Sequence, residues 1–256
     1  MIRITYITIT YNAEAVLKRT LDSVLCQDYP KISHFIIDGA STDGTMAIID
    51  DYVRRSNEAD NGHRVQVTSE PDKGIYDAMN KGLRSIDGSY VCFLNAGDFL
   101  PAPDIVSRIV EQISEKDSPA VLYGDTDIVD SEGRFLHHRR LSPPEHLTWK
   151  SFRQGMLVCH QAFYARTDFA IATPYNMQYR YSADVDWCIR VMKAAAKERV
   201  PLLNLKMVVV TYTEEGQTTL HHRESLWERY HVMEHHYGRI QTFLLHCWFV
   251  VRAVFN

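Results

Sequence analysis

Short apolar stretches rich in branched side chains alternate with amphipathic stretches along the first hundred residues. Residues 2–10, 33–38, 65–67 and 89–94 combine Ile, Val, Thr and Phe in a way that predicts buried strands. The apolar spacing of the intervening stretches, such as residues 74–86, predicts helices. Strands that alternate with helices at this pace indicate βαβ units and a largely parallel sheet.

Two helix starts are predicted from polar residues that can accept backbone N–H groups. Asn12 is a candidate N-cap for the first helix, and Asp43 for a helix that begins at residue 45. The apolar face of the first helix comprises Val16, Leu17, Leu21, Val24 and Leu25.

The pattern is less regular after residue 100. It predicts strands over 120–125, 160–166 and 202–212, a hairpin turn at 130–133 with a return strand over 134–140, and helices over 184–196 and 222–237. The tail over 242–255 is apolar and rich in aromatic residues, but it is too short to span a bilayer. We expect residues 240–255 either to lie in a membrane interface or to dock on the core or on a second subunit, as in a homo-oligomer.

Polar residues follow each of the first four predicted strands. They are Thr10-Tyr11-Asn12, Asp38, Glu70-Pro71-Asp72 and Asn95-Ala96-Gly97-Asp98. Because the carboxyl ends of parallel strands meet at one edge of a sheet, these side chains should converge there. The sequence therefore predicts a ligand site at this edge, and Lys73 adds a cation suited to a phosphate.

The composition narrows the class of protein. Hydrophobic residues make up 45% and charged residues 23% of the 256 positions, which is an ordinary globular balance. The formal net charge of -4 argues against general nucleic-acid binding. The five cysteines form no CxxC pair, which indicates free thiols in a reducing compartment rather than a zinc site. With no secretory signal pattern at the N-terminus, we expect a cytoplasmic protein, peripheral on the inner face of the cell membrane if its tail binds lipid.

The order and spacing of the polar motifs resemble glycosyltransferase family 2, and within it bacterial enzymes that assemble exopolysaccharides such as colanic acid. The resemblance covers about residues 2–220. It rests on the motifs above together with residues 37–45, residues 70–82, Tyr123-Gly124-Asp125, His160-Gln161 and Ser182-Ala183-Asp184.

The resemblance implies an α/β fold of the GT-A type. This fold has a Rossmann-like, mostly parallel central sheet with flanking helices, here followed by a helical, apolar C-terminal tail. The implied GT-A domain covers 1–220, with a nucleotide-sugar-binding half over 1–100 and an acceptor-binding half over 101–220. Residues 221–256 then form the C-terminal segment.

The resemblance also implies a donor site for a nucleotide-sugar, with a UDP-sugar as the first expectation. Thr10, Tyr11, Asp38 and Asp72 would bind the nucleotide, with Tyr11 stacked on the base, and Lys73 would meet a phosphate. Glu70 and Asp77 have a structural alternative, since the helix macrodipole alone favours an acid at a helix N-terminus.

The segment from Asn95 to Asp98 occupies the place of the family's DxD motif, whose carboxylates hold a divalent cation on the donor diphosphate. Asp98 is the implied ligand for Mn²⁺ or Mg²⁺, both of which favour oxygen donors. Asn95 replaces the first acid, so the resemblance leaves metal dependence open. Asn95, His160 and Gln161 are expected near the diphosphate or the acceptor.

The resemblance implies that Asp184 is the catalytic base of an inverting transfer. A carboxylate in this role removes the proton from the acceptor hydroxyl as the hydroxyl attacks the sugar. Asp186, two residues further on, should point elsewhere on the helix. The implied acceptor is a saccharide, lipid-linked in the biosynthesis of a bacterial surface or exopolysaccharide, and the loop over 216–219 resembles one that closes over the diphosphate.

Two other functions remain open at this point. A sugar-phosphate nucleotidyltransferase would need a Gly-rich basic loop near its N-terminus, and the residues after Thr10 do not form one. A non-catalytic sugar-nucleotide-binding protein of the same fold would fit Asn95, whereas Asp98 and Asp184 argue against it.

Overall fold

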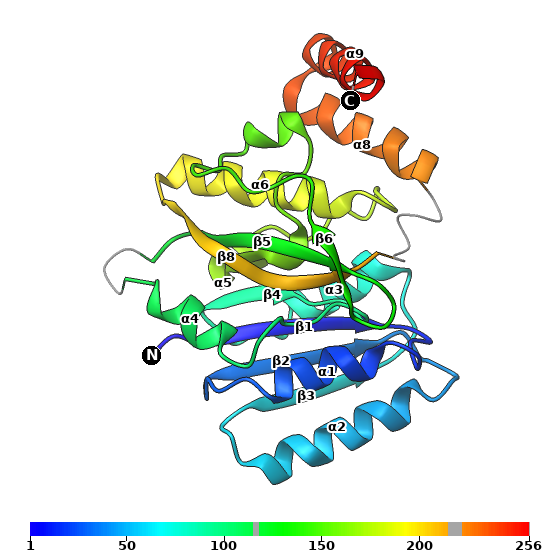
Figure 1. Cartoon of the computed structure of the whole chain (residues 1–256), viewed down its shortest axis with the longest axis vertical. Helices are drawn as coiled ribbons and strands as arrows, with labels where there is room; N and C mark the ends of the chain where they lie inside the picture. Colours follow the sequence, from blue (N-terminus) through cyan, green and yellow to red (C-terminus); the bar gives the residue numbers. More distant parts are fainter. Residues whose placement is uncertain (115–117, 215–221, 256) are drawn as a thin grey trace.

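One mixed sheet forms the centre of the protein, as seen in a computed structural model that describes residues 1–114, 118–214 and 222–255 (Figure 1). Within these residues, eight strands lie in the order β3-β2-β1-β4-β7-β5-β6, and β8 pairs with β5. The strands are β1 (Ile4–Thr10), β2 (Ile32–Asp38), β3 (Arg64–Ser69), β4 (Tyr90–Phe93), β5 (Val121–Val129), β6 (Phe135–His138), β7 (Phe163–Arg166) and β8 (Leu202–Thr213).

The two halves of the sheet differ in strand direction. Strands β3, β2, β1 and β4 are parallel, as the alternation of strands and helices predicts. Strand β7 is antiparallel to both β4 and β5, and β6 is antiparallel to β5, while β8 is parallel to β5. The first half therefore forms a continuous parallel edge, and the second half joins it through β7.

Helices cover both faces of the parallel half. They are α1 (Leu17–Leu25) and α2 (Thr45–Ala59) on one face and α3 (Ile75–Leu83) on the other. Ile36 belongs to a buried cluster with Leu17 and Tyr52, while its neighbour Ile37 belongs to the main core with Met79. Since successive residues of a strand point to opposite faces, α3 lies across the sheet from α1 and α2.

Gly82 lets α3 approach the sheet closely. A methyl group at this position would lie 2.7 Å from Cγ2 of Ile7, which is closer than carbon atoms pack. The close approach fixes the distance of α3 from the sheet, and the first turn of α3 carries part of the candidate site.

The remaining helices belong to the second half of the chain. They are α4 (Ile105–Glu111), η1 (Ser151–Gln154), η2 (His160–Ala162), α5 (Thr167–Ala172), α6 (Ala183–Glu198), α8 (His222–Tyr237) and α9 (Arg239–Phe255). Helices α8 and α9 lie at the end of the molecule beyond α6, opposite the end that holds α2 (Figure 1). No helix within the described residues is long and apolar enough to cross a membrane.

Two helix starts differ from the sequence predictions. Asn12 is not an N-cap, because its φ is 46° and its Oδ1 accepts the N–H of Thr42 at 2.9 Å, and α1 begins only at Leu17. At α2 the N-cap is Gly44, and the Oδ1 of Asp43 accepts the N–H of Thr45 at 3.0 Å in a local turn. Asn12 therefore stabilises the loops at the sheet edge, whereas Asp43 accepts the first N–H of α2 from one position before the N-cap.

The predicted strand over 160–166 is shorter than expected. Residues His160–Ala162 form the 3-10 turn η2, and β7 begins at Phe163. This turn places His160 and Gln161 just before the strand, where their side chains reach the loop after β4.

Candidate active site

The carboxylate of Asp38 lies at the carboxyl end of β2 and is held from two sides. Its Oδ2 accepts the N–H of Ser41 at 3.0 Å and the hydroxyl of Ser69, at the end of β3, at 2.6 Å. Its Oδ1 accepts the hydroxyl of Ser41 at 2.5 Å. A carboxylate offers about four acceptor positions, and three of those of Asp38 are filled. The side chain is also fully buried, so Asp38 lies beneath the edge rather than open to solvent.

Tyr11 and Asp72 meet above Gly39, the residue after Asp38. A methyl group at Gly39 would lie 2.6 Å from Oδ2 of Asp72 and 3.2 Å from Cδ2 of Tyr11. The Tyr11 side chain is 63% exposed, so its ring is available to a planar ligand. Thr10 is buried, and its Oγ1 has no hydrogen-bond partner within the described residues. The structure therefore brings these predicted residues to one edge of the sheet.

The acids at the start of α3 divide between two kinds of role. Asp77 accepts the N–H of Lys73 at 3.0 Å, and Glu70 pairs with Lys81 at 2.9 Å. Asp72 accepts the N–H of Gly74 through Oδ1 at 2.8 Å, while its Oδ2 faces Gly39. Asp77 and Glu70 therefore have structural partners, whereas one oxygen of Asp72 is directed toward the strand-end loops.

Asp98 is a buried residue of the loop that follows β4. Its Oδ2 accepts a hydrogen bond from Nε2 of Gln161 at 2.8 Å, and its Oδ1 accepts the N–H of Thr213 at 3.4 Å. Burial raises the pKa of Asp98 to about 7, although the hydrogen bond from Gln161 and the charge of His160 act in the opposite direction. Residues 160–161 therefore contact the 95–98 segment directly.

His160 connects Asn95 to Asp184. Nδ2 of Asn95 lies 3.2 Å from Nε2 of His160, and Nδ1 of His160 lies 3.3 Å from Oδ2 of Asp184. Nδ1 of His160 is thus placed to donate to Asp184, with the amide of Asn95 facing Nε2. The side chain of Asn95 therefore holds the imidazole that contacts Asp184.

Asp184 lies in the first turn of α6, where three elements converge on it. The hydroxyl of Tyr76, in α3, donates to its Oδ1 at 3.3 Å, and 18% of the Asp184 side chain remains exposed. Burial favours the neutral acid, but the hydrogen bond and charge of His160 and the charge of Arg229 outweigh it. The pKa of Asp184 is therefore below its ordinary value.

Tyr76 is a site residue that sequence reasoning missed. It stacks on Tyr175 with ring centroids 5.5 Å apart, and Tyr175 stacks in turn on Trp187 of α6. This aromatic column directs the hydroxyl of Tyr76 toward α6. A Tyr within the polar segment before α3 was a usable signal, but its partner lies 108 positions away along the chain.

Asp186 points away from this cluster, as predicted. It is buried and accepts hydrogen bonds from Nε2 of His236 at 2.8 Å and from Nε of Arg190 at 2.7 Å. Burial raises its pKa, but these two partners outweigh burial and keep the pKa low. Asp186 therefore ties α6 to α8.

Asn95 and Asp98 are the residues that would hold a divalent cation. Oδ1 of Asn95 is buried without a partner within the described residues, and Asp98 supplies a carboxylate in the same loop. No group of three or more His, Cys, Asp or Glu side chains gathers around a common point in the described part of the chain. The pair fits a cation that takes most of its ligands from a diphosphate and water, as Mg²⁺ commonly does.

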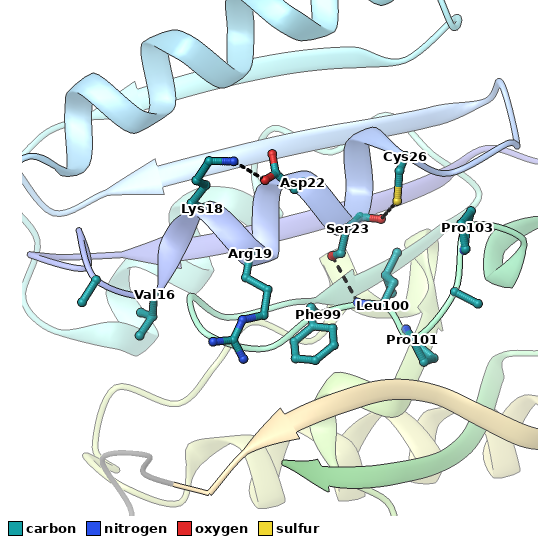
Figure 2. A pocket seen from close by; sticks show the side chains of 12 residues that line it. Val16, Lys18, Arg19, Asp22, Ser23, Cys26, Phe99, Leu100, Pro101 and Pro103 are labelled. Carbon is teal, nitrogen blue, oxygen red and sulfur yellow. Dashed lines mark hydrogen bonds and ion pairs between the residues drawn. The ribbon is translucent and has the colours of Figure 1, made fainter. Parts of the chain in front are cut away.

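A surface pocket of about 640 Å³ lies between α1 and residues 99–103 (Figure 2). The guanidinium of Arg19 lies 5.3 Å from the ring centroid of Phe99, and Oγ of Ser23 accepts the N–H of Leu100 at 3.1 Å. No predicted site residue lines this pocket. The contacts tie the segment after Asp98 to α1, and the pocket is separate from the candidate site.

The loop over 216–219 lies outside the described residues.

Comparison with known proteins identifies relatives of this architecture. Residues 5–173 match the model of the family described as Glycosyl transferase family 2. A "PGL/p-HBAD biosynthesis glycosyltransferase" of Mycobacterium bovis is 32% identical over 212 residues, which cover 81% of this chain and 75% of the relative. An "uncharacterized glycosyltransferase" of Mycobacterium tuberculosis is 31% identical over 190 residues, covering 73% of this chain and 68% of the relative.

Solved structures share the fold at lower sequence identity. TarS of S. aureus superposes with a TM-score of 0.68 at 18% identity over 91% of this chain, which spans only 38% of TarS. TarS 1-349 in complex with UDP-GlcNAc gives a TM-score of 0.67 at 17% identity, covering 84% of this chain and 59% of that one. A mannosyltransferase from Pyrobaculum calidifontis in complex with GDP-Man and Mn²⁺ gives 0.58 at 20% identity, covering 90% and 63%.

Proposed function

Since the chain belongs to glycosyl transferase family 2 and is therefore a glycosyltransferase of GT-A fold, we propose that it moves a sugar from a UDP-sugar to a saccharide acceptor with inversion at the anomeric carbon. The UDP-GlcNAc and UDP complexes of TarS support a uridine donor. In this proposal, residues 1–100 bind the nucleotide-sugar, residues 101–220 bind the acceptor, and residues 221–256 form a separate C-terminal segment.

The observation that carries the proposal is the environment of Asp184. Its pKa is lowered, so the side chain is ionised at neutral pH, and part of it remains exposed to an incoming hydroxyl. An ionised carboxylate in this position can take the proton of the acceptor hydroxyl as the new bond to the sugar forms. Tyr76 and His160 donate to its two oxygens and orient it.

The donor contacts follow from the edge formed by Tyr11, Asp38 and Asp72. The exposed ring of Tyr11 would stack on the base. Asp38 is buried under Ser41, so it would take an N–H or hydroxyl of the nucleoside on a shift of the Ser41 loop. Oδ2 of Asp72 lies against Gly39 beside them. Buried Thr10, with an unpartnered Oγ1, supplies a further polar atom, and the exposed Lys73 a cation for a phosphate.

The diphosphate would lie next to the loop of Asn95 and Asp98, with Mn²⁺ or Mg²⁺ between them. When bound, such a cation offsets the negative charge that develops on the departing diphosphate. The pairing of Gln161 with Asp98 would hold that carboxylate in one orientation, and the contact of Asn95 with His160 would fix the imidazole.

The acceptor is proposed to be lipid-linked, as in the assembly of a bacterial surface or exopolysaccharide. Helix α9 exposes Ile240, Phe243, Leu244 and Trp248, each more than half exposed. A row of exposed apolar and aromatic side chains supports contact with a lipid surface at the inner face of the membrane. Cosedimentation with anionic vesicles tests this contact, and a concentration-dependent dimer without vesicle binding would point to a second subunit instead.

A donor panel with product analysis tests the proposed function. The protein is incubated with UDP-linked and GDP-linked sugars and simple saccharide acceptors, with and without Mn²⁺, and nucleotide release is measured. Nuclear magnetic resonance then reads the anomeric configuration of the product. Release of UDP with a β-linked product from an α-linked donor supports the proposal, whereas retention of configuration contradicts it.

A further inference from the structure

Helix α8 reaches the residues that immediately precede Asp184. The carboxylate of Glu228 accepts the backbone N–H groups of Arg180 at 2.7 Å, Tyr181 at 2.6 Å and Ser182 at 2.6 Å. Ser182 is the N-cap of α6, and its own side chain makes no capping hydrogen bond. One carboxylate from another helix therefore satisfies three consecutive backbone donors at the start of α6.

The arrangement is chemically strong because the acceptor is charged. Hydrogen bonds to an ionised carboxylate are stronger than those between neutral groups, and the N-terminus of a helix attracts negative charge. The hydroxyl of Ser182 also donates to the carbonyl of Ser225, one turn earlier in α8, at 3.2 Å. The backbone two residues before Asp184 is thus fixed from the same helix by two different side-chain contacts.

A second contact joins the same two helices further along. His236 of α8 donates to Asp186 at 2.8 Å, and both side chains are buried. Ser225, Glu228, Val232 and His236 recur at helical spacing, so one face of α8 follows α6. The His236 contact lies one turn beyond the loop and does not bind residues 180–182.

We propose that Glu228 is a positioning residue for the glycosyl transfer, which holds the 180–182 loop so that the Asp184 carboxylate faces the acceptor hydroxyl. The inference rests on the proposed role of Asp184. The family match ends at residue 173, so it assigns nothing to α8. Asp38 ends β2 and Asp72 follows β3, both away from α8, and Glu228 should therefore affect turnover rather than donor affinity.

The test compares Glu228→Gln and Glu228→Ala with a control at the same helix interface, His236→Asn. Glu228→Gln keeps the shape of the side chain but replaces one acceptor oxygen with a donor, and Glu228→Ala removes all three hydrogen bonds. We expect kcat to fall at least about tenfold in the Ala variant and less in the Gln variant, with donor KM changed by less than about twofold. His236→Asn should lower Tm while leaving kcat within about twofold of the parent.

Asp184→Asn provides the background that separates positioning from general destabilisation. If Glu228 acts through Asp184, adding Glu228→Gln to Asp184→Asn should lower the residual rate by less than about twofold, although Glu228→Gln lowers kcat in the parent. Three results would each overturn the inference. They are an equal further loss of kcat in both backgrounds, an unchanged kcat in both Glu228 variants, and a loss of kcat in His236→Asn as large as that in Glu228→Ala. Full activity of Asp184→Asn alone would instead overturn the proposed base.

Discussion

The donor edge and the Asp184 cluster are built in different ways. At the donor edge, Asp72 is held by Gly74 two residues away, and Asp38 by Ser41 three residues away and by Ser69 on the neighbouring strand 31 residues away. Around Asp184, the contacts join Tyr76 across 108 positions and link Asn95 to His160 across 65. Binding groups thus come from local loops on a parallel sheet, whereas the groups proposed for chemistry depend on the antiparallel return through β7 and on α8.

The largest expected effect concerns turnover at the Asp184 cluster. Asp184→Asn keeps the shape of the side chain but cannot accept a proton at neutral pH, so kcat should fall by roughly 10²–10⁴-fold. Steady-state UDP release measures this loss. Asp186→Asn serves as the control on the same helix. Its Tm should fall because His236 and Arg190 lose a charged partner, and its kcat should change far less.

The next effect concerns stability and its dependence on pH. The folded-state pKa of Asp98, about 7, lies above its ordinary value of 3.8, so the native state holds the proton more tightly than the unfolded chain. The contribution of the protonated Asp98 to the stability of the fold is therefore complete below about pH 4 and is lost as the pH rises through 7. In EDTA at pH 8, Asp98→Asn should be more stable than the parent by about 2–4 kcal/mol.

Urea unfolding of Asp98→Asn and of the parent is measured at pH 8 and at pH 4. The difference in their free energies of unfolding should nearly disappear at pH 4. Greater stability of the parent at pH 8 would show that the Asp98 carboxylate is not penalised by burial. Transfer activity should fall in the same variant if this side chain holds the cation.

A smaller effect is expected at the donor edge. Asp72→Asn weakens one charged acceptor beside Tyr11 while keeping a group that can accept the N–H of Gly74. Donor KM should rise about tenfold, which corresponds to about 1.4 kcal/mol, with kcat changed by less than about twofold. A loss confined to kcat would place Asp72 with the chemistry and remove the distinction between the two regions.

The smallest effect is expected at the ion pair of Glu70 and Lys81. The Glu70 side chain is 54% exposed, and exposed pairs contribute about 0–1 kcal/mol. Glu70→Gln should therefore shift the free energy of unfolding by less than about 1 kcal/mol and leave kcat and donor KM unchanged. A large rise in donor KM would mean that Glu70 belongs to the donor site rather than to the structure of α3.

The parallel half of the fold was predictable because strand and helix periodicities are local. The positions of Asp38 and Asp72 at one edge follow from the rule that parallel strands end together. The helix starts were harder, since Asn12 binds the neighbouring loop at Thr42 instead of capping α1, and Asp43 lies one position before the N-cap of α2. Loop-to-loop hydrogen bonds of this kind leave no periodic signal in a sequence.

The chemistry side was only partly predictable. Asp184 and the 160–161 pair were found through a family resemblance, which gave candidate residues but no contacts. The hydrogen bond from Tyr76 depends on an aromatic column through Tyr175 and Trp187, and the bonds of Glu228 depend on the docking of α8. Such contacts arise from tertiary packing between distant segments, so spacing along the chain cannot reveal them.

Titration of UDP into Asp184→Asn by calorimetry, with the parent and Asp72→Asn alongside, tests the separation of binding from chemistry most directly. We expect Asp184→Asn to bind UDP with a Kd within about twofold of the parent despite its lost turnover, and Asp72→Asn to bind about tenfold more weakly. Weak UDP binding by Asp184→Asn together with unchanged binding by Asp72→Asn would contradict the separation of donor binding from chemistry.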